Sequence, residues 1–254
     1  MKVNVLLGLV FFFITCLNTL NAACQANNQA NVPIKISFIN TINNIPVVLD
    51  SGNYTNCWNE TFNINALKYY ISNVQLQTAE KKIAAEKNSY HLINEEDSAS
   101  KNFSFMASPG IYKTLSFLIG IDSLKNVSGA QTNALDPLNG MFWTWNSGYV
   151  MFKLEGYSAG SAVIKNKIEY HIGGFSGANS VLRRVELNIE NSAVLLDKNS
   201  TTEIIVHTDL SKIWNAVHEL KISKTPICTT PGILAAGIAD NYSKAFEILK
   251  VIHP

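Results

Sequence analysis

The sequence predicts an all-β protein, an antiparallel β-sandwich or barrel with one or two short helices near the C-terminus. Two observations support this fold class. Short segments in which apolar and polar residues alternate recur along the chain, and clusters of Asn, Gly, Asp and Pro separate them. The alternation has the period of a half-buried strand, and the separating residues favour turns.

The first expected strand covers residues 33–39, where Ile34, Ile36 and Phe38 fall on one face. Similar alternation predicts further strands at residues 73–77, 114–120, 149–156, 167–174, 181–190 and 202–210. Short strands joined by turn-forming residues are typical of a fold in which sheets pack on each other.

Two short helices are expected near the C-terminus. Asp209 is suited to cap a helix over residues 210–217, and Asp240 is suited to cap a second over residues 241–252. Apolar residues recur at helical spacing in the second segment. Neither helix is long enough to form a domain by itself.

Residues 1–23 have the layout of a secretory signal peptide. Lys2 precedes an apolar run over residues 5–17, and small residues follow. This run is too short to span a bilayer, and no later segment contains about 18 uninterrupted apolar residues. We expect an exported protein in the periplasm or at the cell surface, with residues 24–254 as a single domain because no linker or repeat is visible.

Three cysteines follow the signal: Cys24, Cys57 and Cys228. An odd number in an oxidising compartment implies one thiol with a separate fate. A Cys57–Cys228 disulfide and a lipidated Cys24 account for all three, and residues 21–24 loosely resemble a lipoprotein cleavage box. Ordinary cleavage near Ala22 or Ala23 is the alternative. A membrane is therefore an expected partner only through a lipid anchor.

Charge and motifs exclude several classes of function. The formal net charge is +1 and no Lys or Arg cluster is present, so nucleic acid and anionic membrane surfaces are not expected partners. The motifs of common hydrolases, nucleotide-binding enzymes and zinc proteins are also absent from the sequence. We therefore expect a binding protein rather than an enzyme.

Residues 135–156 carry an unusual aromatic pattern. If this segment is extended, Met141, Trp143 and Trp145 share one face. Two indoles side by side need either a deep core or a cofactor to cover them. A core aromatic pair is the commoner arrangement, and both interpretations stay open at this point.

Two of the five histidines, His91 and His171, follow a Tyr directly inside predicted strands. Imidazole is a common copper ligand, and strand histidines can be brought together across a sheet. A hydrogen-bonded structural role is the alternative for each of them. His253, beside the C-terminus, is the weakest candidate.

Several strings occur in the same order in the MbnP-like copper-binding family, which this chain resembles over residues 32–252. They are LKYYISNV at 67–74, YHLI at 90–93, PGIY at 109–112, ALDPLNGMFWTWNSGY at 134–149, KLEG at 153–156, YHIGG at 170–174 and IADNYSKAFEI at 238–248. The most specific is the M-x-W-x-W-x-x-G-Y pattern from Met141 to Tyr149, and the HIGG string is second.

The resemblance implies an exported copper-binding β-sandwich, often made alongside a di-haem peroxidase related to MauG. In relatives such as MopE and CorA, histidines bind copper together with a tryptophan oxidised to kynurenine. His91 and His171 look like the ligand histidines, and Trp143 and Trp145 look like the tryptophans available for oxidation. Glu169 stands two residues before His171, so a kynurenine at that position is excluded.

We therefore expect one copper ion bound by His91 and His171, with a role in copper acquisition, storage or delivery. A third contact is expected from one of four side chains: Trp143, Trp145, Met141 or Met151. An apolar setting of this kind suits the reduced ion. A metal-free cell-surface binding or adhesion module is the rival hypothesis, in which the Trp pair packs the core or stacks on a sugar ring.

Overall fold

The computed structural model describes residues 30–129, 131–144, 148–189, 194–196 and 202–253. Residues 31–254 form one compact unit. The expected signal segment, Cys24 and Trp145 lie outside the described residues. No helix within the described ranges is long and apolar enough to cross a membrane.

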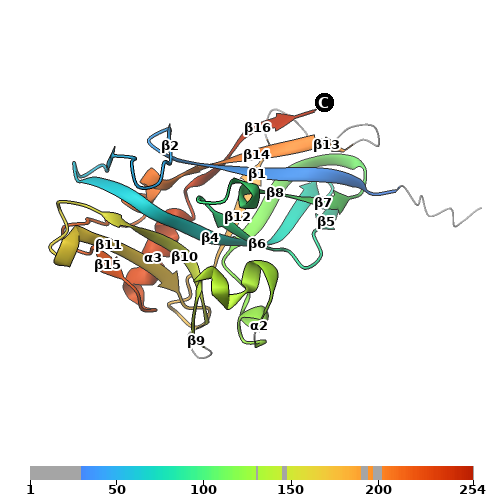
Figure 1. Cartoon of the computed structure of the whole chain (residues 1–254). Helices are drawn as coiled ribbons and strands as arrows, with labels where there is room; N and C mark the ends of the chain where they lie inside the picture. Colours follow the sequence, from blue (N-terminus) through green and yellow to red (C-terminus); the bar gives the residue numbers. More distant parts are fainter. Residues whose placement is uncertain (1–29, 130, 145–147, 190–193, 197–201, 254) are drawn as a thin grey trace, which may run out of the picture. The chain divides into compact units, whose positions relative to one another are not determined.

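Strands dominate the described fold and form two sheets (Figure 1). The small sheet has the order β16 (Phe246–Ile252), β14 (Thr202–Asp209), β1 (Val32–Ile42) and β2 (Ile45–Pro46), with β7 (Asn102–Ala107) also paired to β1. The large sheet has the order β12 (Arg183–Asn188), β8 (Gly110–Ile119), β4 (Thr61–Thr78), β10 (Gly148–Tyr157), β11 (Lys167–Gly173) and β15 (Ile227–Cys228). Shorter strands join it: β3 (Tyr54–Thr55), β5 (Ile83–Ala85), β6 (Tyr90–Asn94), β9 (Phe142–Thr144) and β13 (Val194–Leu196). The predicted all-β class is confirmed.

The helices are short and lie in the connections. The longest described helix is α3 (Ile233–Tyr242), of 10 residues. The others are η1 (Ser98–Lys101), α2 (Ser123–Asn126), η2 (Asn133–Leu135), η3 (Pro137–Asn139), η4 (Ile164–Asn166) and η5 (Leu210–Ile213).

Strand pairing is mixed rather than purely antiparallel. Strands β1 and β14 run parallel, with Phe38 opposite Val206, and β11 and β15 also run parallel. The alternation predicted for β1 is present, because Ile34, Ile36 and Phe38 are all buried on one face. The sequence pattern therefore identified the strand and its buried face, while its parallel partner lies far away in the chain.

Strand β4, with 18 residues, joins the two halves of the large sheet. Its first half pairs with β10 and its second half pairs with β8 along the same edge, while β6 and β5 pair along the opposite edge. The register with β8 shifts between Ser72 and Gln75, and the intervening Asn73 has φ 53°. Asparagine tolerates this left-handed conformation better than most residues do, so it suits the irregular point in the strand.

Four aromatic rings connect the two sheets in the core. Phe38 and Phe246 come from the small sheet, and Tyr69 and Phe117 come from the large sheet. Phe38 lies 6.4 Å from Tyr69 and 6.0 Å from Phe117, and Phe246 lies 5.9 Å and 5.3 Å from the same two rings. All four contacts are edge-to-face, the arrangement that aromatic quadrupoles favour.

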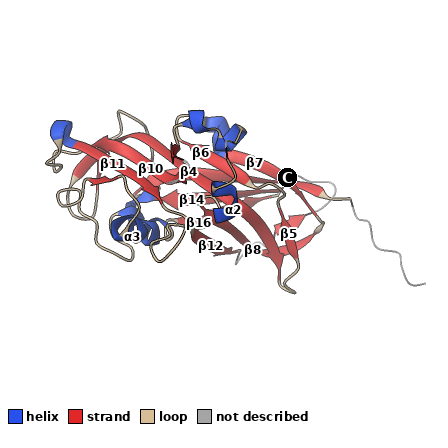
Figure 2. Cartoon of the chain, turned by 90° about the horizontal axis from the view of Figure 1, so that it is seen from below, coloured by secondary structure: helices blue, strands red, loops and turns tan. Residues whose placement is uncertain are grey.

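Helix α3 covers the inner face of β10 and β11. Tyr242 at its end stacks on Phe152 of β10, with ring centroids 4.9 Å apart, and its hydroxyl donates to the Val181 carbonyl at 2.9 Å. The helix lies behind β10 and β11 in Figure 1 and beneath them in Figure 2. With α3 on the inner face, the opposite face of these two strands is left for polar side chains.

One of the two expected C-terminal helices is wrong. Asp209 does cap a helix, accepting from the Ser211 amide at 3.0 Å, although this helix ends at Ile213. The segment expected to be helical over residues 241–252 is instead the end of α3 followed by strand β16. Antiparallel pairing with β14 outweighs the helical spacing of its apolar residues, and a register shift accommodates Leu249.

The expected Cys57–Cys228 disulfide is not formed. Both residues are free thiols: Cys57 is exposed in the turn between β3 and β4, and Cys228 is buried on β15 opposite Tyr170. Partial loss of hydration at Cys57 and burial of Cys228 raise the pKa of both thiols, which keeps them in the less reactive protonated form.

Candidate metal centre

Two glutamates and a histidine lie together on the outer face of the large sheet, the face turned away from the small sheet and α3. Strand register places them there. Glu155 of β10 is directly opposite Glu169 of β11, and Lys153 is opposite His171. Because alternate residues of a strand share a face, all four side chains emerge on the same side.

The ligand atoms of this cluster approach one another closely. The His171 Nε2 atom lies 2.6 Å from Glu155 Oε1 and 3.8 Å from Glu169 Oε1. The three potential ligand atoms all lie within 4.8 Å of one another. Two opposed carboxylates repel each other unless a proton or cation lies between them, so the cluster is electrostatically suited to a cation.

Lys153 connects this cluster to the segment that precedes β9. Its Nζ atom lies 3.7 Å from Glu155 Oε1 and donates to the Gly140 carbonyl at 2.7 Å. Lys68, its neighbour on β4, donates to the Asn139 carbonyl at 3.4 Å. The two lysines therefore hold the end of η3 against the outer face, next to the start of the strand that carries Trp143.

Gly173 leaves the space that Trp143 occupies. A Cβ atom added at Gly173 would come within 2.5 Å of the Trp143 ring, so only glycine fits there without movement. Gly173 is two residues from His171 and shares its face. The HIGG string therefore contains both a potential metal ligand, His171, and the glycine that makes room for the Trp143 ring.

His91 lies in a different environment. Its Nε2 atom lies 2.8 Å from Glu86 Oε2, and its ring stacks on Phe103 of the small sheet, with centroids 3.5 Å apart and planes 4° from parallel. It is therefore directed towards the space between the sheets.

The sheet register separates the two histidines predicted to share a copper ion. His91 is opposite Ile71 of β4, whereas His171 is opposite Lys153, which is opposite Lys68 of β4. Ile71 and Lys68 are an odd number of residues apart and therefore point to opposite faces of the sheet. The geometry does not bring His91 and His171 together around one ion, and copper binding by either stays a prediction.

The other histidines have protein partners. Both ring nitrogens of buried His207 are engaged, Nε2 with Thr41 Oγ1 at 2.6 Å and Nδ1 with Glu247 Oε1 at 2.7 Å. His218 is exposed and lies 2.9 Å from Asp240 Oδ2. A structural role explains His207 completely, and His218 provides an exposed histidine–carboxylate pair for comparison with His171.

The two methionines predicted as third contacts are fully buried. Met141 packs in the core, and its carbonyl accepts from the Val150 amide at 2.9 Å. The Met151 Sδ atom accepts from the Ile121 amide at 3.3 Å. The sulfur of Met151 is thus already used within the fold, while Trp145 lies outside the described residues.

Sequence reasoning missed Glu155 and Glu169 as partners of His171. Glu169 is two residues before His171, so strand periodicity alone places it on the same face. Glu155 belongs to another strand, and only the β10–β11 register brings it opposite Glu169.

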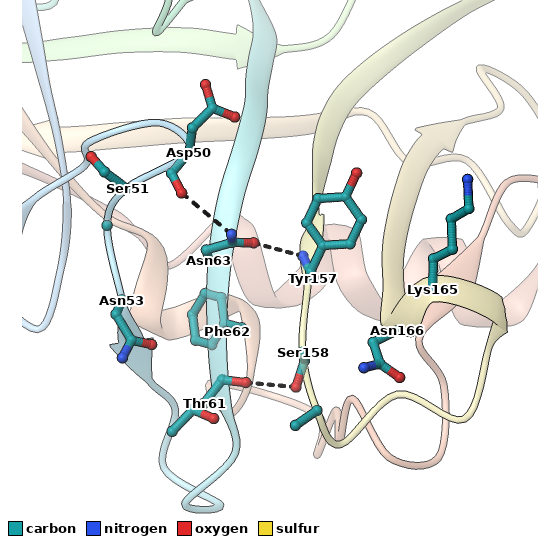
Figure 3. A pocket seen from close by; sticks show the side chains of 12 residues that line it. Asp50, Ser51, Asn53, Thr61, Phe62, Asn63, Tyr157, Ser158, Lys165 and Asn166 are labelled. Carbon is teal, nitrogen blue, oxygen red and sulfur yellow. Dashed lines mark hydrogen bonds between the residues drawn. The ribbon is translucent and has the colours of Figure 1, made fainter.

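A polar pocket of about 360 Å³ lies near the cluster, where Tyr157 ends the strand that carries Glu155 (Figure 3). Asn63 joins its two sides, because its Nδ2 donates to the Asp50 carbonyl at 3.4 Å and its Oδ1 accepts from the Tyr157 amide at 2.8 Å. The Tyr157 side chain is 42% exposed at this pocket. Its described lining contains neither His nor Cys, so it offers none of the nitrogen or sulfur ligands that copper favours.

Comparison with known families decides between the possible classifications of this chain. The family model of MbnP matches residues 31–230, which include the cluster, Trp143 and Gly173. The chain belongs to the MbnP family. The resemblance read from the sequence strings is thereby confirmed at the family level.

One solved structure supports the same fold. MbnP from Methylosinus trichosporium aligns with a TM-score of 0.53 and 16% sequence identity, covering 76% of this chain and 80% of that chain. At this identity the similarity concerns the fold alone. No curated protein sequence matches the chain.

Proposed function

We propose that this MbnP-family chain is an exported copper-binding protein with a role in copper acquisition, storage or delivery. The observation that carries the proposal is the grouping of Glu155, Glu169 and His171, whose ligand atoms lie within 4.8 Å of one another. Imidazole is a common copper ligand, and the adjacent carboxylates offset the charge of a bound cation. This cluster replaces the pair of histidines expected from the sequence.

The residues present fit a copper ion as cargo. The side chains of His171, Glu155 and Glu169 are 15%, 34% and 30% exposed, so an ion can reach them from solvent. Burial is still sufficient to remove part of their hydration, which strengthens their interaction with a cation. Copper is proposed here as the bound substrate, and we propose no catalysed reaction.

Metal analysis and titration test the proposal. Protein purified from its native host is expected to contain copper. In vitro, His171→Ala is expected to lose copper binding, whereas His207→Ala and the exposed control His218→Ala retain it, with circular dichroism to verify folding. Equal loss in folded His171→Ala and His218→Ala, or no loss in either, contradicts the assignment.

Export and processing form part of the same proposal. Residues 1–23 would be removed as a signal peptide, with Cys24 either lipidated or close to an ordinary cleavage site. Fractionation of the native host, combined with mass measurement of the mature N-terminus, distinguishes these outcomes. Retention of the intact N-terminus in the cytoplasm would contradict export.

A metal-free binding module is the second candidate function. The pocket beside Tyr157 favours it, because an exposed aromatic ring among amide and carboxylate groups suits a sugar or another polar ligand. Trp143 gives this alternative less support than expected, because its ring packs against Gly173. Protein that is free of copper in its native host but binds glycans, with binding lost in Tyr157→Ala, would favour this alternative.

A further inference from the structure

We propose that the open edge of strand β16 is a dimerisation surface and that its partner is the same strand of a second copy of this chain. Strand β16 is the last strand of the small sheet, where it pairs with β14 on one side (Figure 1). No other strand in the described part of the chain pairs with its second edge. The surface is separate from the candidate metal centre, which lies on β10 and β11 of the large sheet.

A groove of about 520 Å³ runs along this edge, between β16 and β12. Residues 246–251 of β16 line one side of the groove, and residues 186–189 line the other. Because β12 is the last strand of the large sheet, the groove lies between two open sheet edges. The groove therefore leaves the outer edge of β16 accessible to a further strand.

The backbone of β16 offers unused hydrogen-bonding groups along this groove. The Asp209 amide donates to the Ala245 carbonyl at 2.8 Å, which shows that residues 245 and 247 turn their backbone groups towards β14. In an antiparallel pair the direction of these groups alternates, so those of Phe246 and Ile248 point to the open edge. Such a row of unpaired groups is a template for the addition of a strand.

Apolar side chains accompany these backbone groups. Leu249 is 51% exposed and Ile252 is 38% exposed, although both belong to a strand at the edge of a sheet. Exposed apolar edge strands favour association with other chains. Burial of these two side chains against a partner strand would contribute to the stability of a dimer.

A bulge at Leu249 restricts the strands that fit this edge. Glu247 is opposite His207 of β14, and Leu249 has no counterpart. Lys250 is opposite Ile205, which is two residues from His207, so Glu247 and Lys250 share a face of the sheet. A regular strand alternates its faces at every residue and cannot match both sides of the bulge. The same strand of a second copy contains the same bulge and matches it.

Charge selects the register between the two copies. An antiparallel pair with Glu247 of each copy opposite Lys250 of the other also places Phe246 opposite Val251, two residues that share the inner face. A shift by one residue opposes side chains of different faces, and a shift by two residues removes both ion pairs. The arrangement is symmetric, as expected for an interface between identical chains.

Both charged side chains are available for this contact. Glu247 is 68% exposed, and its Oε1 atom lies 2.7 Å from His207 Nδ1, which leaves the second carboxylate oxygen for a partner. Lys250 is exposed and forms no ion pair with any described residue. Exposed ion pairs contribute more to specificity than to affinity, so their role is to fix the register.

Sedimentation analysis of the mature chain over a series of concentrations tests the inference. Wild-type protein is expected to form a dimer that weakens at high salt, because exposed ion pairs are screened. Lys250→Glu should raise the dissociation constant of the dimer by about tenfold or more, since it places carboxylates opposite each other. Lys81→Glu is the matched control, because it makes the same charge change at an exposed position between β4 and β5.

Two further variants separate the charges from the backbone. Glu247→Lys combined with Lys250→Glu exchanges the two charges within each copy, so this double variant should regain the dimer. Ile248→Pro removes an amide that points to the groove and leaves the hydrogen bonds to β14 intact, so it should abolish the dimer. Circular dichroism verifies that each variant is folded.

The outcomes decide between the possible occupants of the edge. Loss of the dimer in Lys250→Glu and its return in the double variant support the register. A dimer that is unaffected by Lys250→Glu and by Ile248→Pro overturns the assignment of the surface. A wild-type chain that stays monomeric overturns the second copy as partner, even where the edge binds an extended peptide of another protein. His171→Ala is expected to dimerise like wild type, and loss of the dimer in this folded variant would contradict the separation of the two sites.

Discussion

At the scale of single residues, the contact of the Trp143 ring with the backbone of Gly173 connects the packing of this indole to the candidate metal site. The Trp143 ring occupies the volume that any side chain at position 173 would need. Trp143 is half-buried and stands on the face that carries His171. A change at Gly173 should therefore alter both the packing of the indole and the surroundings of the metal cluster.

Gly173→Ala is expected to destabilise the protein by about 1–3 kcal/mol, because the added methyl group displaces the Trp143 ring. Urea unfolding followed by tryptophan fluorescence measures both the free energy of unfolding and the change around the indole. Gly110→Ala is the matched control, since its added Cβ meets no atom closer than 3.8 Å. If the two substitutions lowered the free energy of unfolding equally, the packing of the Trp143 ring would not depend on a glycine at position 173.

Glu60 is a second residue with a definable energetic role. Burial alone raises the pKa of its carboxyl group, but hydrogen bonds from Asn56, Ser223 and Ile222 outweigh this effect and hold the pKa below its ordinary value of 4.5. Its oxygens accept from the Ile222 amide at 2.8 Å and the Ser223 amide at 2.9 Å. The ionised carboxylate thus connects the loop before β4 to the segment that leads to β15.

The lowered pKa of Glu60 predicts a loss of stability in acid. A depressed carboxyl pKa contributes stability above its unfolded value, and this contribution disappears as the pH falls through the folded pKa. In Glu60→Gln, the free energy of unfolding should be lower than in wild type at pH 7, and the difference should shrink below pH 4.5. Urea titrations across this range measure it, with the exposed Glu219→Gln as control. A difference that is independent of pH would contradict the role of the charge.

At the scale of elements, hydrogen bonds from the side chain of Asn241 hold the loop after η5 against helix α3. Its Oδ1 accepts from the amides of Val217 and His218 at 2.9 and 2.8 Å, and its Nδ2 donates to the carbonyls of Ile213 and His218 at 2.8 and 2.7 Å. The side chain is only 1% exposed. Every hydrogen-bonding position of the amide is therefore used on backbone groups at the end of η5 and in the loop that follows it.

Asn241→Ala is expected to lower the free energy of unfolding by about 2–4 kcal/mol, since it leaves several buried backbone groups without partners. Hydrogen exchange should increase first in residues 213–218. Asn215→Ala, at an exposed position in the same loop, serves as control. Unchanged protection of the loop in Asn241→Ala would rule out this fastening role.

The outer face of β10 and β11 is a second feature of this scale. Helix α3 packs on the inner face through Tyr242, so the outer face is free to hold charged residues without burying them in the core. Lys68 and Lys153 bind the backbone of residues 139 and 140 there. The sheet thus separates a packing face from a polar face with two lysines, two glutamates and His171.

At the scale of the whole molecule, the location of Trp143 has consequences for its oxidation. Conversion of an indole to kynurenine removes one carbon and adds one oxygen, which requires a strong oxidant. The sequence contains no C-x-x-C-H motif for covalent haem attachment, so the oxidant is proposed to be an external MauG-like di-haem peroxidase. Since Trp143 stands on the outer face, we propose that this partner approaches it there.

We expect Trp143 or Trp145 to be oxidised only when such a peroxidase is co-expressed. Mass spectrometry of the tryptic peptide that contains both residues detects the exchange of one carbon for one oxygen. Protein expressed without the peroxidase is the control, and Trp143→Phe assigns the position. An unmodified peptide in the presence of the native peroxidase would leave copper binding to the cluster around His171 alone.

The sequence by itself determined the properties that depend on local periodicity and on linear strings. Alternation identified β1 and its buried Ile34, Ile36 and Phe38, because a strand repeats every two residues whatever its partner is. The order of the strings predicted the MbnP family, which the match over residues 31–230 confirms. The same local reasoning placed a cap at Asp209, because that cap involves neighbouring residues only.

Only the tertiary structure decided which side chains share a site. His91 and His171 follow the same Tyr-His pattern, yet the register across four strands places them on opposite faces of the sheet. The pairing of β10 with β11 brings Glu155 to His171. Strand β16 was mistaken for a helix because pairing with β14 outweighs its helical spacing. Each of these outcomes depends on contacts between distant segments, for which local periodicity carries no information.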